Sequence, residues 1–190
     1  RHKEACAYLE DIQRRSGDLL VIPLEIKPGP GWREEAGRRE AGKKVPAVVE
    51  RFNAFKKKAR HRSEWAHVVG FVGRWERSES QGLYARVLFL LESARVSDPR
   101  EAAEAIGRYW ATFTEDKGSF DPAYFISTDA EMLIPFRQVC RGSARHRREL
   151  LEVALPYFTR QELVFRDPDL GLEERFFRGE CPSSGARPTP

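Results

Sequence analysis

The sequence predicts an α+β domain with a split β-α-β-β-α-β arrangement, in which an antiparallel sheet carries its helices on one face. Strand-like runs at 18–26, 64–76 and 83–92 are rich in branched and aromatic residues, and two helical stripes at 45–62 and 98–113 separate them. A six-residue polar connection joins the second and third runs, which suits a hairpin. The other face of such a sheet would remain available for a ligand.

The first elements follow from short local signals. Residues 3–15 are expected to form a short helix, and DLLVIPLEI at 18–26 reads as a strand. Pro23 cannot donate a ladder hydrogen bond, so it predicts an edge position or a bulge. The glycine-rich, charged segment 27–45 is expected to be a long loop.

The two central helices are marked by apolar periodicity and by a cap. Val48, Val49, Phe52 and Phe55 form one stripe in the helix expected over 45–62. In the helix over 98–113, Asp98 is the expected N-cap, Pro99 takes the first helical position and Glu101 is a capping-box partner.

The C-terminal part is less regular. Residues 119–127 are expected to form a last strand, and the basic-to-apolar run 145–155 a helix that Pro156 stops or kinks. The segment 183–190 has a disordered composition, so we expect one domain over 1–182 followed by a tail.

Composition limits the classes of function. The net charge is +4, and the sequence pI is about 9.1. Three cysteines without CxxC spacing indicate a reducing compartment and no zinc site. No apolar run approaches membrane-spanning length and no signal peptide is visible, so we expect a cytoplasmic protein with no membrane partner.

A tyrosine and an arginine stand two residues apart on the third strand run, GLYARVLFLL. Side chains two apart on a strand point to the same face, so Tyr84 and Arg86 share one side. The hairpin is expected to bring Glu76 close to both. Taken alone, a carboxylate beside an arginine on a sheet face favours a plain ion pair.

The segment HVVGFVGRWERSESQGLYARVLFLLE, followed by ARVSDPREAAEAIGRYWATFT, resembles the core of the inovirus replication-initiator family. These are filamentous-phage-type nicking proteins, related to the rolling-circle His-hydrophobic-His (HUH) endonucleases, with relatives in prophages and other mobile elements. Trp75-Glu76, 82–91 and 107–110 carry the pattern. ALPYFTRQE and ERFFRGECP resemble its later segments, so the resemblance covers about 18–182.

The resemblance implies the sheet fold of rolling-circle initiator nuclease domains and a metal-dependent chemistry. In that family two histidines of the His-hydrophobic-His strand and a nearby acid or amide hold a divalent metal such as Mg²⁺ or Mn²⁺, which polarises a scissile phosphate. A tyrosine on a later helix attacks and remains bonded to the DNA. By this resemblance Tyr157 is the candidate nucleophile, and Arg160 stands where the family has an assisting lysine.

The chain departs from the family at the metal site. Tyr84 and Arg86 occupy the two histidine positions, and neither is a usual ligand for Mg²⁺ or Mn²⁺. Glu76 remains, but one carboxylate is not a competent site. We therefore expect a former metal site, with no metal and no other cofactor. Arg86 then either contacts Glu76 or binds a phosphate in place of the metal. Histidines at both positions are expected to restore Mn²⁺ binding.

Two basic clusters and one tryptophan are the candidate nucleic-acid contacts. Lysine and arginine supply most non-specific affinity for DNA by neutralising phosphates. The first basic cluster contains Lys56, Lys57, Lys58, Arg60 and Arg62, and it could equally complement a helix dipole. The second basic cluster contains Arg141, Arg145, Arg147 and Arg148, at the start of a helix, where cations are unfavourable. Trp32 could stack on a base or cap the core.

Three functional hypotheses follow. The first is a DNA-binding domain descended from a rolling-circle initiator, with metal-dependent nicking lost, acting on single-stranded or origin-like DNA in a phage or mobile-element context. The second is an active nicking endonuclease that uses Tyr157 and Mg²⁺ or Mn²⁺. The third is a protein-interaction module that binds no nucleic acid. Salt-dependent DNA binding separates the first from the third.

Overall fold

The protein is an α+β fold with an open antiparallel sheet. The computed structural model describes residues 2–29, 47–59, 61–78, 82–122, 137–139, 143–160 and 176–179. The strand order is β4-β1-β3-β2-β6, and β5 also pairs with β1. The strands are β1 (Leu19–Pro28), β2 (Val68–Ser78), β3 (Gly82–Glu92), β4 (Gly118–Pro122), β5 (Arg137–Val139) and β6 (Phe176–Arg178). The longer helices are α1 (His2–Ser16), α3 (Ala47–Ala59) and α4 (Pro99–Phe113).

The strand β1 lies inside the sheet, so the edge position or bulge that Pro23 predicted is wrong. Antiparallel pairing with β3 runs without a register shift from Leu19 to Ile26. On its other side β1 pairs with β5 over Leu19–Val21 and with β4 over Leu24–Pro28. Pro23 falls in the gap between these two partners, where its missing N–H interrupts neither ladder.

The central hairpin is confirmed. β2 and β3 are adjacent and antiparallel, with Glu76 opposite Tyr84 and Arg74 opposite Arg86. β2 begins at Val68 rather than at residue 64, because Ser63–Trp65 forms a turn of 3₁₀-helix. The register shifts once, between Val68 and Gly70.

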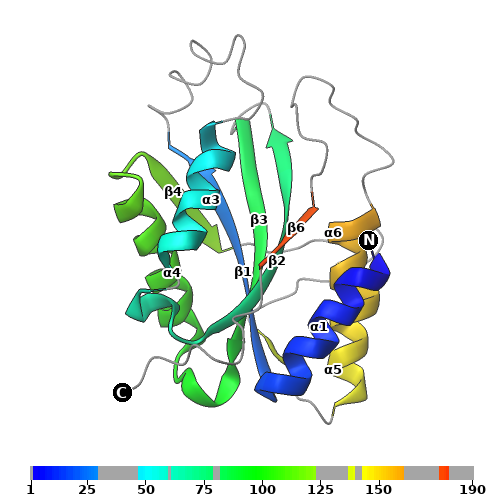
Figure 1. Ribbon diagram of the computed structural model, residues 1–190. Helices are drawn as coiled ribbons and strands as arrows, with labels where there is room; N and C mark the ends of the chain where they lie inside the picture. Colours follow the sequence, from blue (N-terminus) through cyan, green and yellow to red (C-terminus); the bar gives the residue numbers. More distant parts are fainter. Residues whose placement is uncertain are drawn as a thin grey trace.

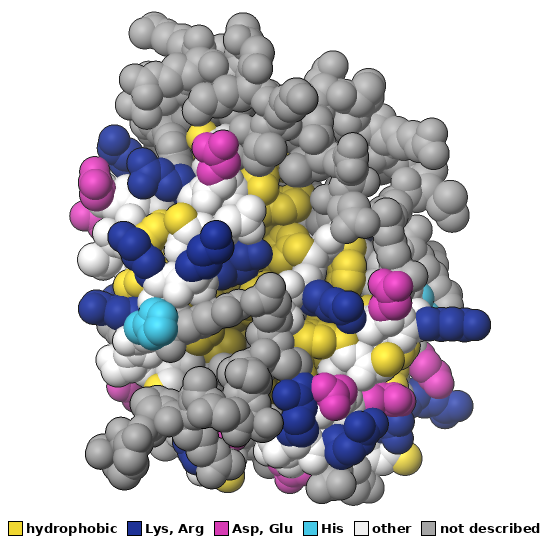
Figure 2. Space-filling model, viewed as in Figure 1, with side chains coloured by type: hydrophobic (Ala, Val, Ile, Leu, Met, Phe, Trp, Pro, Cys, Tyr) yellow, Lys and Arg dark blue, Asp and Glu magenta, His cyan; other side chains and the backbone are white. Residues whose placement is uncertain are grey.

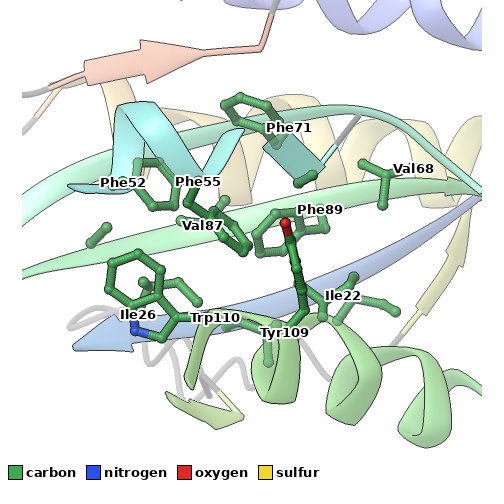
Figure 3. Packing of buried hydrophobic residues seen from close by; sticks show 14 of the residues in the cluster. Ile22, Ile26, Phe52, Phe55, Val68, Phe71, Val87, Phe89, Tyr109 and Trp110 are labelled. Carbon is green, nitrogen blue, oxygen red and sulfur yellow. The ribbon is translucent and has the colours of Figure 1, made fainter. Parts of the chain in front are cut away.

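The larger core lies between one face of the sheet and the helices α3 and α4. Its centre is a group of contacting aromatic rings: Phe52 and Phe55 from α3, Phe71 from β2, Phe89 from β3, and Tyr109 and Trp110 from α4 (Figure 3). The Asp98 carboxylate accepts hydrogen bonds from the N–H groups of Arg100 and Glu101, so the predicted cap of α4 is confirmed.

The second face of the sheet is also covered by helices, so the prediction of helices on one face is wrong. Figure 1 shows α3 and α4 on one side of the sheet, and α1, α5 (Ala144–Arg148) and α6 (Leu155–Arg160) on the other. Leu88 and Leu90 of β3 pack there against the apolar sides of α1 and α6. Gly70 lets α1 approach closely, because a Cβ at this position would overlap Tyr8 and Ile12.

The last helical segment continues past Pro156 to Arg160. A π-helical stretch, Glu149–Ala154, connects α5 to α6 immediately before the proline. Pro156 lacks the N–H that a regular α-helix would pair, and the wider π turn comes just before it. The helix is therefore not stopped at Pro156, and its irregular part precedes the proline.

Other sequence expectations meet the structure only in part. β4 is confirmed as a strand next to β1, although it ends at Pro122. Most of the loop expected over 27–45 and the tail 183–190 lie outside the described residues. Within the part of the chain that the structure describes, no helix combines the length and apolar character needed to cross a bilayer.

Candidate functional site

One half of the second sheet face is apolar and the other half is charged. The apolar half lies beneath α1 and α6 and contains Leu19, Val21, Val72, Leu88 and Leu90. Further along the same strands, at the end near the β2–β3 hairpin, the alternation places polar residues on this face. We call them the ion network: Glu25 and Lys27 of β1, Arg74 and Glu76 of β2, and Tyr84 and Arg86 of β3, joined by Asp121 of β4.

Arg86 is the centre of the ion network. Its Nε atom donates to Glu25 Oε1 at 2.9 Å and lies 3.2 Å from Glu76 Oε2. Since β3 runs between β1 and β2, the two carboxylates reach Arg86 from opposite sides. Their side chains are only 15% and 13% exposed, so water screens these pairs weakly.

Glu76 makes two further contacts. The Tyr84 hydroxyl donates to Glu76 Oε2 at 2.8 Å, and Arg74 Nε lies 3.0 Å from Glu76 Oε1. The Arg86 guanidinium also lies over the Tyr84 ring, 5.8 Å from its centroid. Glu76, Tyr84 and Arg86, which the sequence placed on one face, therefore do meet there. Of the two alternatives for Arg86, contact with Glu76 or binding of a phosphate, the structure shows the contact with Glu76.

Lys27 connects the ion network to β4. Its Nζ lies 2.7 Å from both Glu25 Oε2 and Asp121 Oδ2. Burial lowers the pKa of Lys27, but the hydrogen bonds and charges of Asp121 and Glu25 outweigh this and raise the pKa above its ordinary value. Positive and negative groups therefore alternate across four strands, in the order Asp121, Lys27, Glu25, Arg86, Glu76 and Arg74.

Tyr84 is held in its neutral form. Burial raises the pKa of the Tyr84 phenol, and the neighbouring Glu76 carboxylate raises it further because it repels a phenolate and accepts the phenol's hydrogen bond. Tyr84 is thus a hydrogen-bond donor at neutral pH and not a nucleophile.

The residues present do not fit a divalent metal. A guanidinium already stands between the two carboxylates, and an arginine cannot deprotonate to become a ligand. Within the described ranges, no three side chains of the His, Cys, Asp and Glu types gather closely enough to hold a metal ion. The chemistry of this donor set is therefore ion pairing and not metal coordination.

Sequence reasoning missed Glu25, Lys27, Arg74 and Asp121. Glu25 and Lys27 alternate with apolar residues at the end of an otherwise apolar strand. This alternation was the one sign in the sequence that β1 contributes polar side chains to a sheet face. It could not be used because nothing local says that β1 pairs with β3, nor in which register. Arg74 precedes Glu76 by two residues on β2, so the period of the strand was the signal that both share one face.

The candidate catalytic residues fall on α6. The backbone of Tyr157 and Arg160 belongs to this helix, but their side chains lie outside the described part, as do Trp32, Arg60 and Arg141. Leu155 and Phe158 of α6 are buried against the apolar half of the second face. The candidate nucleophile therefore comes from a helix on the same sheet face as the ion network, and its role stays a prediction.

The first basic cluster lies at the end of α3, beside aromatic rings. Lys56 Nζ lies 5.2 Å from the centroid of Phe52, with Phe71 and Phe177 at 5.5 and 5.4 Å. Lys58 Nζ is 5.5 Å from the centroid of Phe113, and the guanidinium carbon of Arg62 is 5.2 Å from that of Tyr109. Figure 2 shows mainly basic side chains on this α3–α4 side of the molecule.

The second basic cluster is balanced by carboxylates. Arg145 pairs with Glu149 at 3.1 Å, Arg148 with Glu152 at 3.0 Å, and Arg147 with Glu10 of α1. Acidic and basic side chains alternate over this side in Figure 2. These ion pairs explain why arginines can stand at the start of a helix even when no DNA is bound. The position of the second basic cluster is therefore weaker evidence for a nucleic-acid partner than the sequence suggested.

Comparison of the chain with protein-family models, curated proteins and solved structures gives no match.

Proposed function

We propose that this chain is a DNA-binding domain of the rolling-circle initiator type, from a phage or mobile element, in which metal-dependent nicking has been lost. One observation carries the proposal. The helix that bears Tyr157 packs on the sheet face that bears Glu76, Tyr84 and Arg86. An initiator needs this juxtaposition, because its nucleophile must reach a phosphate held at the metal site.

The order of the strands supports the same proposal. β3 lies between β1 and β2 and is antiparallel to both, so β1 and β2 are parallel and are separated by one strand. With β4 beside β1, the element order β1-α3-β2-β3-α4-β4 supports the proposal that the core is of the split β-α-β-β-α-β type. The helices α1, α5 and α6 and the strands β5 and β6 are additions to this core.

The ion network supports the loss of nicking. A metal-dependent nuclease needs a Lewis acid with open coordination positions next to the scissile phosphate. Here the place between Glu25 and Glu76 holds a guanidinium, which balances charge but offers no coordination position for an oxygen. No step of phosphodiester cleavage follows from this arrangement.

The α3–α4 side is the DNA-binding surface in this proposal. Lys57, Lys58 and Arg62 provide cations, and the rings of Tyr109 and Phe113 lie directly beneath two of them. The Tyr109 ring is only 9% exposed, so unpaired bases would stack on the Arg62 guanidinium above it and not on the ring, while the lysines would pair with phosphates. A DNA partner is compatible with the cytoplasmic location expected from the sequence.

The proposal is tested by fluorescence anisotropy with a labelled single-stranded oligonucleotide and its duplex, each in EDTA and in Mn²⁺. We expect binding in both buffers, with the single strand preferred. A K57A/K58A/R62A variant should bind more weakly. A K3A/R14A/R15A variant, which also removes three exposed positive charges but from α1 on the other side of the sheet, should retain most of the affinity. Binding that disappears in EDTA would contradict the metal-independent account.

The position of α6 also keeps the active nickase as a second candidate. A single-stranded oligonucleotide incubated with Mn²⁺ and resolved on a denaturing gel is expected to give no covalent adduct. An adduct that is lost in Tyr157→Phe would establish nicking and overturn the proposed loss. Absence of any DNA binding at low salt would favour the interaction module.

A further inference from the structure

A thiol, an imidazole and a hydroxyl meet where the start of α1 packs against α6. Cys6 Sγ lies 3.6 Å from His2 Nε2, one helical turn away on α1, and His2 Nδ1 lies 3.1 Å from Thr159 Oγ1 of α6. Cys6 is a free cysteine and is partly exposed, whereas Thr159 is buried. This cluster is separate from the ion network and from both basic clusters.

Hydrogen bonding fixes the neutral tautomer of His2. The Thr159 hydroxyl donates its single hydrogen to the carbonyl oxygen of Leu155 at 3.0 Å. It can therefore only accept from His2, so the neutral imidazole carries its hydrogen on Nδ1. The lone pair of Nε2 then faces Cys6 and accepts the S–H hydrogen. A nucleophile, a base and a group that orients the base thus form one chain of hydrogen bonds.

The surroundings of Cys6 make a base important at neutral pH. Burial raises the pKa of the Cys6 thiol, and the Glu10 carboxylate, one turn further along α1, raises it further because it repels a thiolate. The thiolate, and not the thiol, is the form of cysteine that attacks. Little free thiolate is therefore present near pH 7, and transfer of the S–H proton to His2 is the direct way to form it.

We propose that Cys6 is a modification site for small disulfides, with His2 as its base and Thr159 as the residue that positions His2. The Cys6 sulfur attacks one sulfur of a disulfide R–S–S–R while its proton passes to His2 Nε2. A Cys6–S–S–R bond forms, the S–S bond of the reagent breaks, and the departing R–S⁻ takes the proton from His2 and leaves as R–SH. The Cys6 sulfur is oxidised and the departing sulfur is reduced, so no other reactant is needed. This inference is independent of DNA binding.

Reaction with 2-hydroxyethyl disulfide, a neutral probe, tests the proposal. Mass spectrometry of the peptides follows the adduct on Cys6 and separates it from Cys140 and Cys181. At pH 7 the adduct should form in the parent. His2→Gln, which keeps a hydrogen-bonding side chain but removes the base, should slow it by at least about tenfold. His61→Gln removes an exposed histidine elsewhere, so it is the matched control and should leave the rate unchanged.

The pH profile separates a base from a merely structural residue. Between about pH 7.5 and 9 the parent rate should be nearly level, because a neutral imidazole takes the proton. The His2→Gln rate should instead rise about tenfold per pH unit, in step with the free thiolate. Thr159→Val should slow the reaction at pH 7 by a few-fold, and Thr159→Ser, which keeps the hydroxyl, should retain the parent rate.

Three results would overturn the proposal. The first is that no adduct forms on Cys6 in the parent. The second is a folded His2→Gln variant, judged by circular dichroism, that reacts at the parent rate. The third is a pH profile of this variant that runs parallel to that of the parent. If His2→Gln does not fold, Thr159→Val is compared with Thr159→Ser, and equal rates in these two variants would equally refute the assignment.

Discussion

At the scale of single residues, Glu25 is the most informative side chain of the ion network. Its two oxygens contact Arg86 and Lys27, and so it links the cations of β3 and β1. Removing one partner from a shielded pair is costly because it leaves the other charge uncompensated in a poorly hydrated place. Replacing any one charged member of the ion network is therefore expected to be costly, even if the complete network adds little net stability.

We predict that Glu25→Gln lowers the free energy of unfolding by about 2–4 kcal/mol, because Arg86 and Lys27 lose a shared counter-charge. Urea denaturation at pH 7, followed by tryptophan fluorescence, measures the change. Glu104→Gln is the matched control. It breaks a pair with Arg108 in which both side chains are about 60% exposed, and it should cost no more than about 0.5 kcal/mol. Equal losses in the two variants would contradict a shielded network.

A second residue-scale prediction concerns alkaline pH. The folded-state pKa values of Tyr84 and Lys27 are both raised above their ordinary values of 10.0 and 10.5. A group with a raised folded-state pKa gives stability that is complete below its unfolded-state pKa and is lost as the pH rises toward its folded-state pKa. Stability should therefore begin to fall near pH 10.

Tyr84→Phe isolates the contribution of the phenol. At pH 8 the variant should lose about 1–2 kcal/mol, because Glu76 loses a hydrogen-bond donor. Above pH 10 its stability should fall less steeply than that of the parent, by up to about 1.4 kcal/mol per pH unit. Urea denaturation at intervals from pH 8 to 11 gives both profiles, and parallel profiles would show that Tyr84 does not resist ionisation in the folded protein.

At the scale of elements, β6 joins the two helical layers at the edge of the sheet. It pairs with β2 through Val72, Gly73 and Arg74. The Phe177 ring lies over Gly73 and next to Lys56, on the α3 side. Arg178 extends to α1 on the other side, where its guanidinium carbon is 5.5 Å from the centroid of Tyr8. A short strand thus makes contacts on both faces.

We predict that Gly73→Ala destabilises the protein by about 1–3 kcal/mol, because the added methyl group would overlap the Phe177 ring. In a Phe177→Ala background the same change should cost less, but part of the loss should remain, because the added methyl group would still crowd the Arg86 carbonyl oxygen. Gly82→Ala, where a methyl group meets no atom, measures the cost of a positive φ alone. A double-mutant cycle by urea denaturation checks this. Additive losses would mean that Phe177 does not pack on Gly73 in solution.

The elements also show how far the sequence could predict the structure. The helices α3 and α4 and the β2–β3 hairpin were predictable, because each is specified by local periodicity, a cap or a short connection. The second helical layer was missed, although Leu88 and Leu90 alternate with the equally buried Phe89 and Leu91. A strand that is apolar on both faces indicates layers on both sides.

The residues of the candidate site also fall into a group that the sequence could predict and a group that it could not. Glu76, Tyr84 and Arg86 could be grouped in advance because one hairpin places them within a few residues of each other along the chain. Glu25 and Asp121 reach the ion network only through pairing between strands that are far apart in sequence. Long-range register of this kind depends on the whole sheet, so no local pattern specifies it.

At the scale of the whole molecule, the two basic clusters differ in a way that their sequences do not show. The arginines 145, 147 and 148 each have a carboxylate partner, whereas Lys58 and Arg62 of the first basic cluster lie over aromatic rings. A phosphate that approaches the second basic cluster competes with a glutamate for each of these arginines. We therefore expect DNA affinity to depend mainly on the α3–α4 side.

The salt dependence of single-stranded DNA binding tests the central claim most directly. Anisotropy in EDTA from about 20 to 200 mM NaCl should give a straight line of negative slope for log affinity against log salt. K57A/K58A/R62A should make this slope shallower by about 2, for three lost phosphate contacts, and R145A/R147A/R148A should change it less. A slope near zero in the parent, or no binding at the lowest salt, would contradict the account of this protein as a metal-independent DNA-binding domain.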